Sequence, residues 1–339
     1  MILSTLDKSR KGGAYEQIPS LVLGQRWTPQ LNSRNMMKVV LCVWIEPYIE
    51  TDLSFCVWPV HTPTTSKEVL TLSASTSPLP YTGNKSCIVN TILSVMPKHT
   101  VYIDPCMGSA EVFFRKPRAE KEILNDYNGD LVNLFRVIQN NEKLAYLLGR
   151  LYLSINGELA FKQNKDRLKG VPNILDDVIE TSQIFYDASW EDIQNAAAFL
   201  ENQVYSFSST GQTFGIARRD MSQRLPRLMS AYNRIRDAII LHRDYKDVIT
   251  YAACPGSFIL LDPPYKGTED MYSKANFDIE QHDILFSFMS EVNQQHHGEV
   301  KFLITYNNGP YIRGLAEKHG FDTFVQTRLH SMKQSKEAG

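Results

Sequence analysis

Short apolar runs alternate with helically spaced apolar positions from residue 81 onward. The runs Val101–Ile103 and Glu122–Leu124 end at acidic or amide residues, as buried strands often do. Ile88–Met96 and Asp130–Gln139 place apolar side chains three and four residues apart, which predicts amphipathic helices. This strand–helix alternation predicts the opening of a parallel, doubly wound α/β sheet.

The sheet pattern returns near the C-terminal end of the sequence. Phe258–Leu261 and Phe302–Thr305 are apolar runs that predict two more buried strands, and Thr323–Leu329 predicts a last one. The intervening residues 140–250 have mostly helical periodicity. We therefore expect one α/β sheet interrupted by a helical insert.

Residues 1–77 sustain neither a helical nor a strand period, and they lead into the Ser/Thr/Pro-rich run Thr62–Pro78, which is typical of a linker. This composition favours a poorly ordered extension. The alternative is a small accessory module with strands at Lys38–Trp44 and Leu53–Val60. The whole chain then divides into this extension (1–77), two parts of the sheet domain (78–139 and 251–332), the helical insert (140–250) and a polar tail (333–339).

Composition indicates a soluble globular protein. Of the 339 residues, 43% are hydrophobic and 22% are charged, and the formal net charge is −1. The five cysteines show no CxxC pair or other metal-ligand spacing, which favours a cytoplasmic protein without a metal site. The apolar stretch Val39–Val60 is interrupted by Glu46, Pro47, Glu50 and Asp52, so we do not expect it to cross a membrane.

Charge is strongly segregated within the helical insert. Val171–Ala217 contains no Lys or Arg, whereas the following stretch is rich in arginine. Because the net charge is −1, any surface that binds nucleic acid must be a local patch such as this one. The candidates for contacts with DNA phosphates are Arg218, Arg219, Arg224 and Arg227, with Arg234 and Arg236 in the same run. The alternative is an ordinary solvated helix face.

The tetrapeptide Asp262-Pro263-Pro264-Tyr265 is the most informative chemical feature. An exocyclic amine of a nucleobase is a poor nucleophile because its lone pair is delocalised into the ring. The Asp262 carboxylate and the Pro263 carbonyl could accept the two hydrogens of such an amine, and the prolines stiffen the turn. Tyr265 offers a ring face on which an extruded base can stack. The alternative is an ordinary strand end with a Pro-rich turn.

A turn and an acidic residue in the first half of the sheet domain predict a nucleoside cofactor. Asp104–Ala110 joins a strand to a helix and contains Gly108, which lets a ligand approach the backbone. Asp126 ends the next strand, where an acidic residue typically binds ribose hydroxyls. The turn is not GxGxxG, so we expect a ribose without a pyrophosphate, as in S-adenosylmethionine. The alternatives are a structural turn and a helix N-cap at Asp126.

Four segments together resemble the motifs of a known family, the Dam-like adenine-N6 DNA methyltransferases. In chain order they are Tyr81–Lys85, Tyr102–Ser109, Leu124–Leu131 and Asp262–Tyr265, and the likeness covers about residues 78–332. It implies an α/β fold, a Rossmann-like S-adenosylmethionine-dependent methyltransferase sheet with a mostly helical target-recognition insert. It also implies a monomeric bacterial or phage enzyme that acts on double-stranded DNA without a metal. Whether the enzyme has a restriction endonuclease partner is left open by the resemblance.

The resemblance also assigns roles to individual residues. It implies that the cofactor contacts Tyr81, Lys85, Asp126 and Asp262, with Asp104 and Gly108 at its methionine end. Asp262, Pro263 and Tyr265 would be the catalytic residues that hold the flipped adenine. Cys106 and Asn84 stand where the family usually has Phe and Gly. The family usually adds a final strand after Thr323–Leu329, so we expect this strand to form an unpaired sheet edge.

Two other functions remain open on the sequence. One is methylation of another planar amine, such as cytosine N4, an RNA base or a protein glutamine. The other is a degenerate protein that binds DNA without catalysis. Relatives that act on other amines often carry Asn or Ser at the position of Asp262, so this residue favours adenine.

Overall fold

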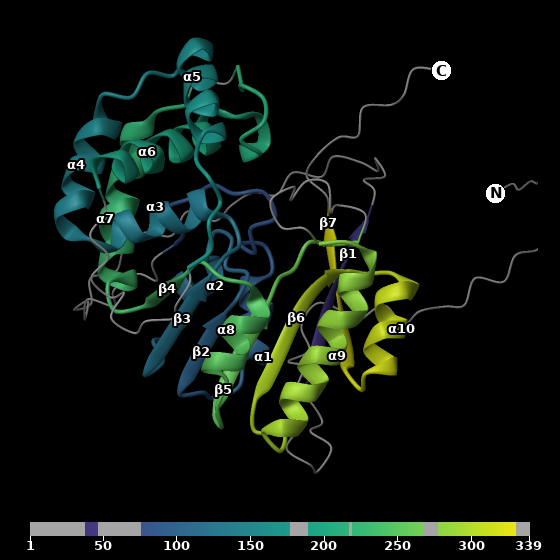
Figure 1. Ribbon diagram of the computed structural model, residues 1–339. Coiled ribbons are helices and arrows are strands. Elements are labelled where there is room, and N and C mark those ends of the chain that lie inside the picture. The colour runs from purple at the N-terminus through teal and green to yellow at the C-terminus, as the bar shows by residue number, and fades with distance from the viewer. Residues whose placement is uncertain (1–37, 47–75, 177–188, 217–218, 267–276, 330–339) are drawn as a thin grey trace, which may run out of the picture. The chain divides into compact units, whose positions relative to one another are not determined.

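The computed structural model describes residues 38–46, 76–176, 189–216, 219–266 and 277–329 (Figure 1). The chain divides into two compact units, Met1–Arg34 and Asn35–Gly339. All described residues belong to the second unit.

The second unit is built on a seven-stranded sheet with the order β4-β3-β2-β5-β6-β1-β7. Every neighbouring pair in it is parallel. The strands are β1 (Lys38–Glu46), β2 (Val101–Asp104), β3 (Lys121–Asn125), β4 (Ile239–Leu241), β5 (Ser257–Leu261), β6 (Lys301–Asn307) and β7 (Asp322–Leu329). The predicted Rossmann-like α/β fold is thereby confirmed.

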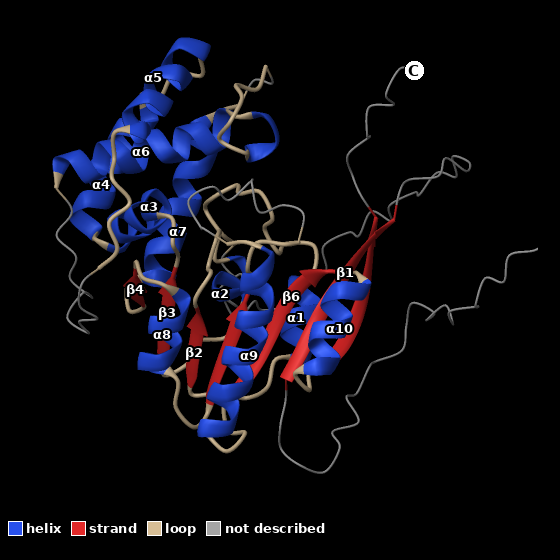
Figure 2. Ribbon diagram, turned by 45° about the vertical axis from the view of Figure 1, so that its right-hand side comes forward, coloured by secondary structure: helices blue, strands red, loops and turns tan. Residues whose placement is uncertain are grey.

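Helices cover both faces of the sheet (Figure 2). One face is covered by α1 (Val89–Val95), α2 (Glu111–Arg115), α3 (Gly129–Gln139) and α7 (Leu225–Ile235), and the other by α8 (Tyr245–Ala252), α9 (Ile279–Gln295) and α10 (Pro310–Lys318). Successive strand residues point to opposite faces, so Tyr102 packs in one core and Ile103 in the other. This two-sided burial explains why the strands are continuous apolar runs.

The helical insert packs against α3 through one long helix. The insert contains α4 (Asn141–Tyr152), α5 (Glu158–Lys169) and α6 (Trp190–Tyr205), and short 3₁₀ turns follow at Phe207–Ser209 and Met221–Arg224. A capping box starts α6, in which Ser189 and Asp192 satisfy each other's backbone N–H groups. Ala196, Ala197 and Leu200 of α6 are fully buried in the same core as α3.

The sheet resumes earlier than the sequence interpretation placed it. The range 140–250 assigned to the helical insert contains β4 and α8, and β4 pairs with β3 at Ile123↔Ile239. A strand of three residues gives too short an apolar run to separate it from the preceding helix.

Strand β1 corrects the interpretation of residues 1–77, which assigned them no place in the sheet. It lies between β6 and β7, with Val40 opposite both Ile304 and Thr323. Strand β7 lies at the end of the sheet order, so the expected edge is present, but β1 pairs with its inner side. The second candidate strand Leu53–Val60, most of the linker and the tail 333–339 lie outside the described residues.

No helix of the described part of the chain is long and apolar enough to cross a membrane.

We expect the C-terminal half of the sheet to depend on β1. A chain beginning at Asn35 keeps this strand, whereas one beginning at Pro47 lacks it and leaves β6 and β7 without their shared neighbour. The shorter chain should unfold at a clearly lower temperature, because unpaired backbone groups and apolar surface become exposed. Thermal unfolding followed by circular dichroism compares the two chains. Equal melting temperatures would show that β1 does not hold the sheet together.

Candidate active site

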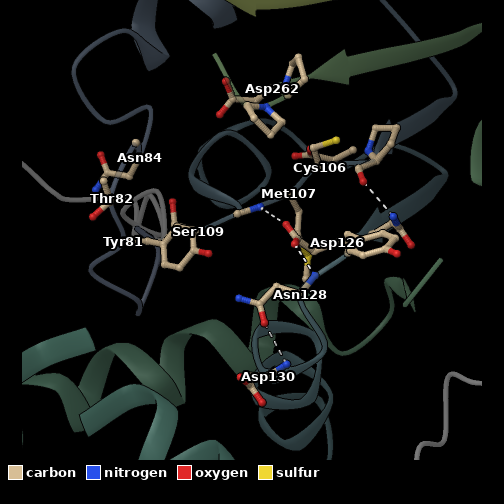
Figure 3. Close-up of a pocket in the computed structure, with 18 of the residues that line it drawn as sticks. Tyr81, Thr82, Asn84, Cys106, Met107, Ser109, Asp126, Asn128, Asp130 and Asp262 are labelled. Carbon is tan, nitrogen blue, oxygen red and sulfur yellow. Dashed lines mark hydrogen bonds between the residues drawn. The ribbon is translucent and has the colours of Figure 1, made fainter. Parts of the chain in front are cut away.

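The carboxyl ends of the central strands meet at one edge of the sheet and surround a cavity of about 820 Å³. Parallel strands place their ends together, and this edge is where open α/β sheets bind ligands. The cavity is lined by Tyr81–Lys85, by the turn after β2, by the residues after β3 and by Asp262–Pro264 after β5. Figure 3 shows these segments converging from opposite sides of the cavity.

Asp126 holds two turns together from the end of β3. Its Oδ2 accepts the Gly108 N–H at 3.0 Å and its Oδ1 accepts the Asn128 N–H at 2.9 Å (Figure 3). The N-cap of α3 is Asn128, whose side chain accepts the Asp130 N–H, so Asp126 is not the helix cap. Gly108 has φ +48°, a left-handed conformation that favours glycine, and the Tyr81 ring lies over it.

Asp104 is buried at the bottom of the cavity, at the end of β2. Its Oδ2 accepts the Tyr102 hydroxyl at 2.9 Å. Burial raises the pKa of Asp104 to about 7, and the nearby Asp262 and Asp126 carboxylates add to the rise, while the Tyr102 hydrogen bond and the Lys85 charge oppose it. Burial likewise raises the pKa of Asp126 to about 6. Asp104 and Asp126 therefore form an acidic floor of the cavity, and their hydrogen bonds do not offset the cost of their burial.

Asp262 is oriented by two groups from different parts of the chain. The Thr305 hydroxyl of β6 donates to its Oδ1 at 2.5 Å, and the Lys85 ammonium group forms an ion pair with its Oδ2. The same ammonium group lies 5.3 Å from the centre of the Tyr265 ring. Burial raises the pKa of Tyr265 to about 12, so its hydroxyl is neutral at physiological pH. The structure thus brings together Lys85, Asp262 and Tyr265, which are far apart in the sequence.

Sequence reasoning missed two groups at this site. Thr305 was assigned only to a strand, although its hydroxyl reaches Asp262. Asp244 and Tyr245, which follow β4, also line the cavity. An acidic residue three positions after a short apolar run is the signal that could have found Asp244, but the strand itself was not recognised. No local sequence pattern marks Thr305, because its hydrogen-bond partner Asp262 lies 43 positions away in the sequence.

Three of the predicted arginines, Arg219, Arg224 and Arg227, do not line the cavity. Arg219 donates to the Val204 carbonyl at 2.6 Å, and Arg227 is exposed. Burial lowers the pKa of Arg224, and the charges of Arg227 and Arg219 lower it further, so these three guanidinium groups form one positive cluster. Arg218 lies outside the described residues.

The sequence placed Arg234 in the arginine run that would contact phosphates, but the structure gives this residue another role. It is buried, and its Nη2 donates to Glu122 Oε1 at 2.8 Å. Lys116 donates to the same carboxylate at 2.6 Å, so a buried triad joins α7 to β3. The sequence did not reveal this role because a buried and an exposed arginine look alike in a charge pattern.

The donor set at the strand ends of the cavity suits a cationic nucleoside rather than a phosphate ligand. The Gly108 N–H, which could bind a phosphate, is already donated to Asp126. Carboxylates on the floor would repel a phosphate and attract positive charge. In the described part of the chain, no cluster of His, Cys, Asp or Glu could hold a metal ion. Burial raises the pKa of the Cys106 thiol well above its usual range, which makes this cysteine a poor nucleophile.

We expect Asp104→Asn to stabilise the cofactor-free protein at high pH. The folded-state pKa of Asp104, about 7, lies above the ordinary value of 3.8. The folded state therefore binds more protons between these values, so wild-type stability falls as the pH rises from about 4 to about 7. The asparagine variant lacks this loss and should melt a few degrees higher at pH 8, with little difference at pH 4. Thermal unfolding at several pH values measures the effect, and the exposed Asp166→Asn is the control. A variant that is no more stable than wild type at pH 8 would contradict the assignment.

Comparison with known proteins identifies the family. The family model of D12 class N6 adenine-specific DNA methyltransferases matches residues 81–334. The chain is 25% identical over 258 residues to the DNA N-6-adenine-methyltransferase of Escherichia phage P1, and 21% identical over 240 residues to modification methylase LlaI of Lactococcus lactis subsp. lactis. These matches cover 71% and 66% of this chain.

The relatives differ greatly in length. The chain spans about a third of the first two, 31% and 36% respectively. It spans 89% of the type II methyltransferase M1.LlaDCHI of Lactococcus lactis subsp. cremoris, to which 75% of it aligns at 23% identity. Since the family model covers most of the sequence and all four motifs, the chain belongs to the D12 class of N6 adenine-specific DNA methyltransferases.

Proposed function

We propose that the protein transfers a methyl group from S-adenosylmethionine to N6 of an adenine flipped out of double-stranded DNA. The observation that carries this proposal is the position of Asp262, held by Thr305 and Lys85 at the rim of a cavity with an acidic floor. Membership in an adenine-specific family supports the same substrate.

Asp262 and Pro263 would act on the target amine. The Asp262 carboxylate and the Pro263 carbonyl accept the two N6 hydrogens, which draws the lone pair back onto nitrogen for attack on the methyl carbon. The Tyr265 ring holds the base by stacking, and its hydroxyl stays protonated because its pKa is about 12. Transfer is direct: the bond from nitrogen to the methyl group forms as the bond from sulfur to the methyl group breaks. The sulfur leaves as the neutral thioether of S-adenosylhomocysteine, and the methylated nitrogen, which then carries the positive charge, releases one proton to water.

S-adenosylmethionine supplies a methyl group on a positively charged sulfur. Asp104 and Asp126 would hold this cation-bearing cofactor, since both carboxylates are poorly compensated in the cavity. Asp126 would bind the ribose, and Tyr81 with Gly108 and Lys85 would close the other wall. Binding a cation beside these carboxylates favours their ionised forms, so the site and the cofactor stabilise each other.

The positive cluster of Arg219, Arg224 and Arg227 would contact the DNA backbone. Such contacts position the duplex and carry no sequence information. The modification methylases among the relatives suggest a role in DNA modification, and a restriction endonuclease partner is part of this proposal only by that analogy. We propose a monomer acting in the cytoplasm.

The decisive experiment follows labelled methyl from S-adenosylmethionine into unmethylated duplex DNA, with nucleoside analysis of the product. Wild type should place label in N6-methyladenine. Asp262→Asn should lower the rate by at least about 100-fold, because an amide cannot reproduce the carboxylate's charge at the amine. Label in N4-methylcytosine, or only in RNA or protein, would refute the adenine assignment. Asp262→Asn with the wild-type rate would refute the mechanism.

Alanine variants of Arg227 and Arg234 distinguish a DNA contact from a structural role. Arg234→Ala should cost about 3–5 kcal/mol of stability, because it leaves the buried Glu122 and Lys116 incompletely paired. The exposed Arg227→Ala should change stability by less than about 0.5 kcal/mol, yet weaken DNA binding and flatten its salt dependence. Urea unfolding and fluorescence anisotropy with duplex DNA measure the two effects. Unchanged DNA affinity in Arg227→Ala would remove this residue from the interface.

A further inference from the structure

The helical insert supplies a second wall of the cavity, opposite in chemistry to the acidic floor. Two amide residues of α6, Asn202 and Gln203, and two lysines of α5, Lys165 and Lys169, line the same cavity as Asp126. We call these four residues the helical wall. None of them belongs to the four sequence motifs, and the fold places them together because α5 packs along α6.

The two amides hold hydrogen-bond capacity that the described residues do not use. Asn202 is 3% exposed and Gln203 is 6% exposed. Neither Asn202 Oδ1 nor Gln203 Oε1 has a hydrogen-bond partner among the described residues. Leaving a buried acceptor without a partner is costly, so such groups usually mark the place of a donor. The Gln203 amide is fixed in place, because it lies directly against Gly211 of the following loop.

The two lysines add positive charge at the same wall. Lys165 Nζ donates to the Gln212 carbonyl at 2.7 Å, which ties α5 to the loop after α6. Lys169 pairs with Asp166 on its own helix, and both side chains are 72% exposed. An exposed pair of this kind is weak and exchanges readily for a better anion. The wall therefore combines buried acceptors with ammonium groups that can bind an anionic ligand.

We propose that the helical wall binds a nucleotide of the target DNA. A base with an exocyclic amine donates to Asn202 and Gln203, and its phosphate binds Lys165 and Lys169. This inference rests on the proposed function and deepens it, because it assigns sequence preference to α6 and backbone contact to α5. The cavity volume, about 820 Å³, is near the upper end of the ~300–1,000 Å³ range of ligand pockets, which leaves room beside a cofactor at the strand ends.

S-adenosylmethionine offers the same chemistry, an amine and a carboxylate, so the test must separate the two ligands. The variants are Asn202→Ala and Lys165→Ala. Their matched controls are Asn195→Ala, a buried α6 asparagine that also has an unpartnered Oδ1 but does not line the cavity, and Lys162→Ala on α5. The affinity for a mixed-sequence duplex is measured by anisotropy, the affinity for S-adenosylmethionine by calorimetry, and the methylated positions on a plasmid by sequencing.

We expect Asn202→Ala to weaken DNA binding about tenfold and to relax the preferred sequence at one position, since one base-edge contact is lost. Lys165→Ala should weaken DNA binding severalfold with unchanged sequence preference. Neither should alter the affinity for S-adenosylmethionine, and both controls should bind DNA as wild type does. Melting temperatures confirm folding.

Three results would overturn the inference. A selective loss of S-adenosylmethionine affinity would assign the wall to the cofactor. DNA binding that responds equally to Asn202→Ala and Asn195→Ala would show a general packing effect. Wild-type DNA affinity in both Asn202→Ala and Lys165→Ala would show that the wall does not touch DNA. The two affinity measurements need no methyl transfer, so they stay informative even if wild type transfers no methyl group and the proposed function fails.

Discussion

The site depends on holding three carboxylates at one edge of a parallel sheet. Asp104, Asp126 and Asp262 follow β2, β3 and β5, and the parallel register brings them into one cavity. Like charges in a low-dielectric cavity repel, and burial adds a desolvation cost. At least one hydrogen-bond donor reaches each carboxylate and offsets part of these costs. Asp104 accepts from Tyr102, and Asp126 accepts from the Gly108 N–H. Asp262 accepts from both Lys85 and Thr305.

These donors offset the cost of burying the carboxylates only in part, and the remaining cost matters for ligand binding. Burial raises the pKa values of Asp104 and Asp126, and the neutral donors that reach these carboxylates do not offset its cost. Asp262 has the ammonium group of Lys85 beside it and accepts the Thr305 hydroxyl. The three carboxylates of the cavity therefore have different surroundings. In the proposed function, Asp104 and Asp126 would bind a cationic ligand, and Asp262 would be held in a fixed orientation for the target amine.

Much of this arrangement could be predicted from the sequence. The apolar runs predicted β2, β3, β5 and β6, because strands buried on both faces are continuous apolar segments. The sequence also predicted β7, which is an edge strand with exposed residues. The motif residues Lys85, Asp126 and Asp262 do line one cavity, as their places at strand ends and turns implied. Local patterns are sufficient for such features, since each is encoded within a few residues.

Other features depend on contacts between distant residues, and the sequence did not reveal them. Strand β1 has a composition that fits an extension as well as a strand, and only its pairing with β6 and β7 makes it part of the sheet. Arg234 looks like its neighbours in the arginine run, but Glu122 and Lys116 make it structural. Thr305 is one apolar-strand residue among several until Asp262 is placed beside it.

The same reasoning explains why the two walls of the cavity have different origins. Strand ends provide charged acceptors for the chemistry, and their positions are fixed by the sheet. The helical insert provides neutral acceptors, Asn202 and Gln203, on a separate layer that packs on the sheet through α3 and α6. In this proposal, a substitution in α6 can change which base edge is bound without disturbing the carboxylates. The α6 amides and the strand-end carboxylates share no hydrogen bond in the described part of the chain. Chemistry and target preference can therefore vary independently on this fold.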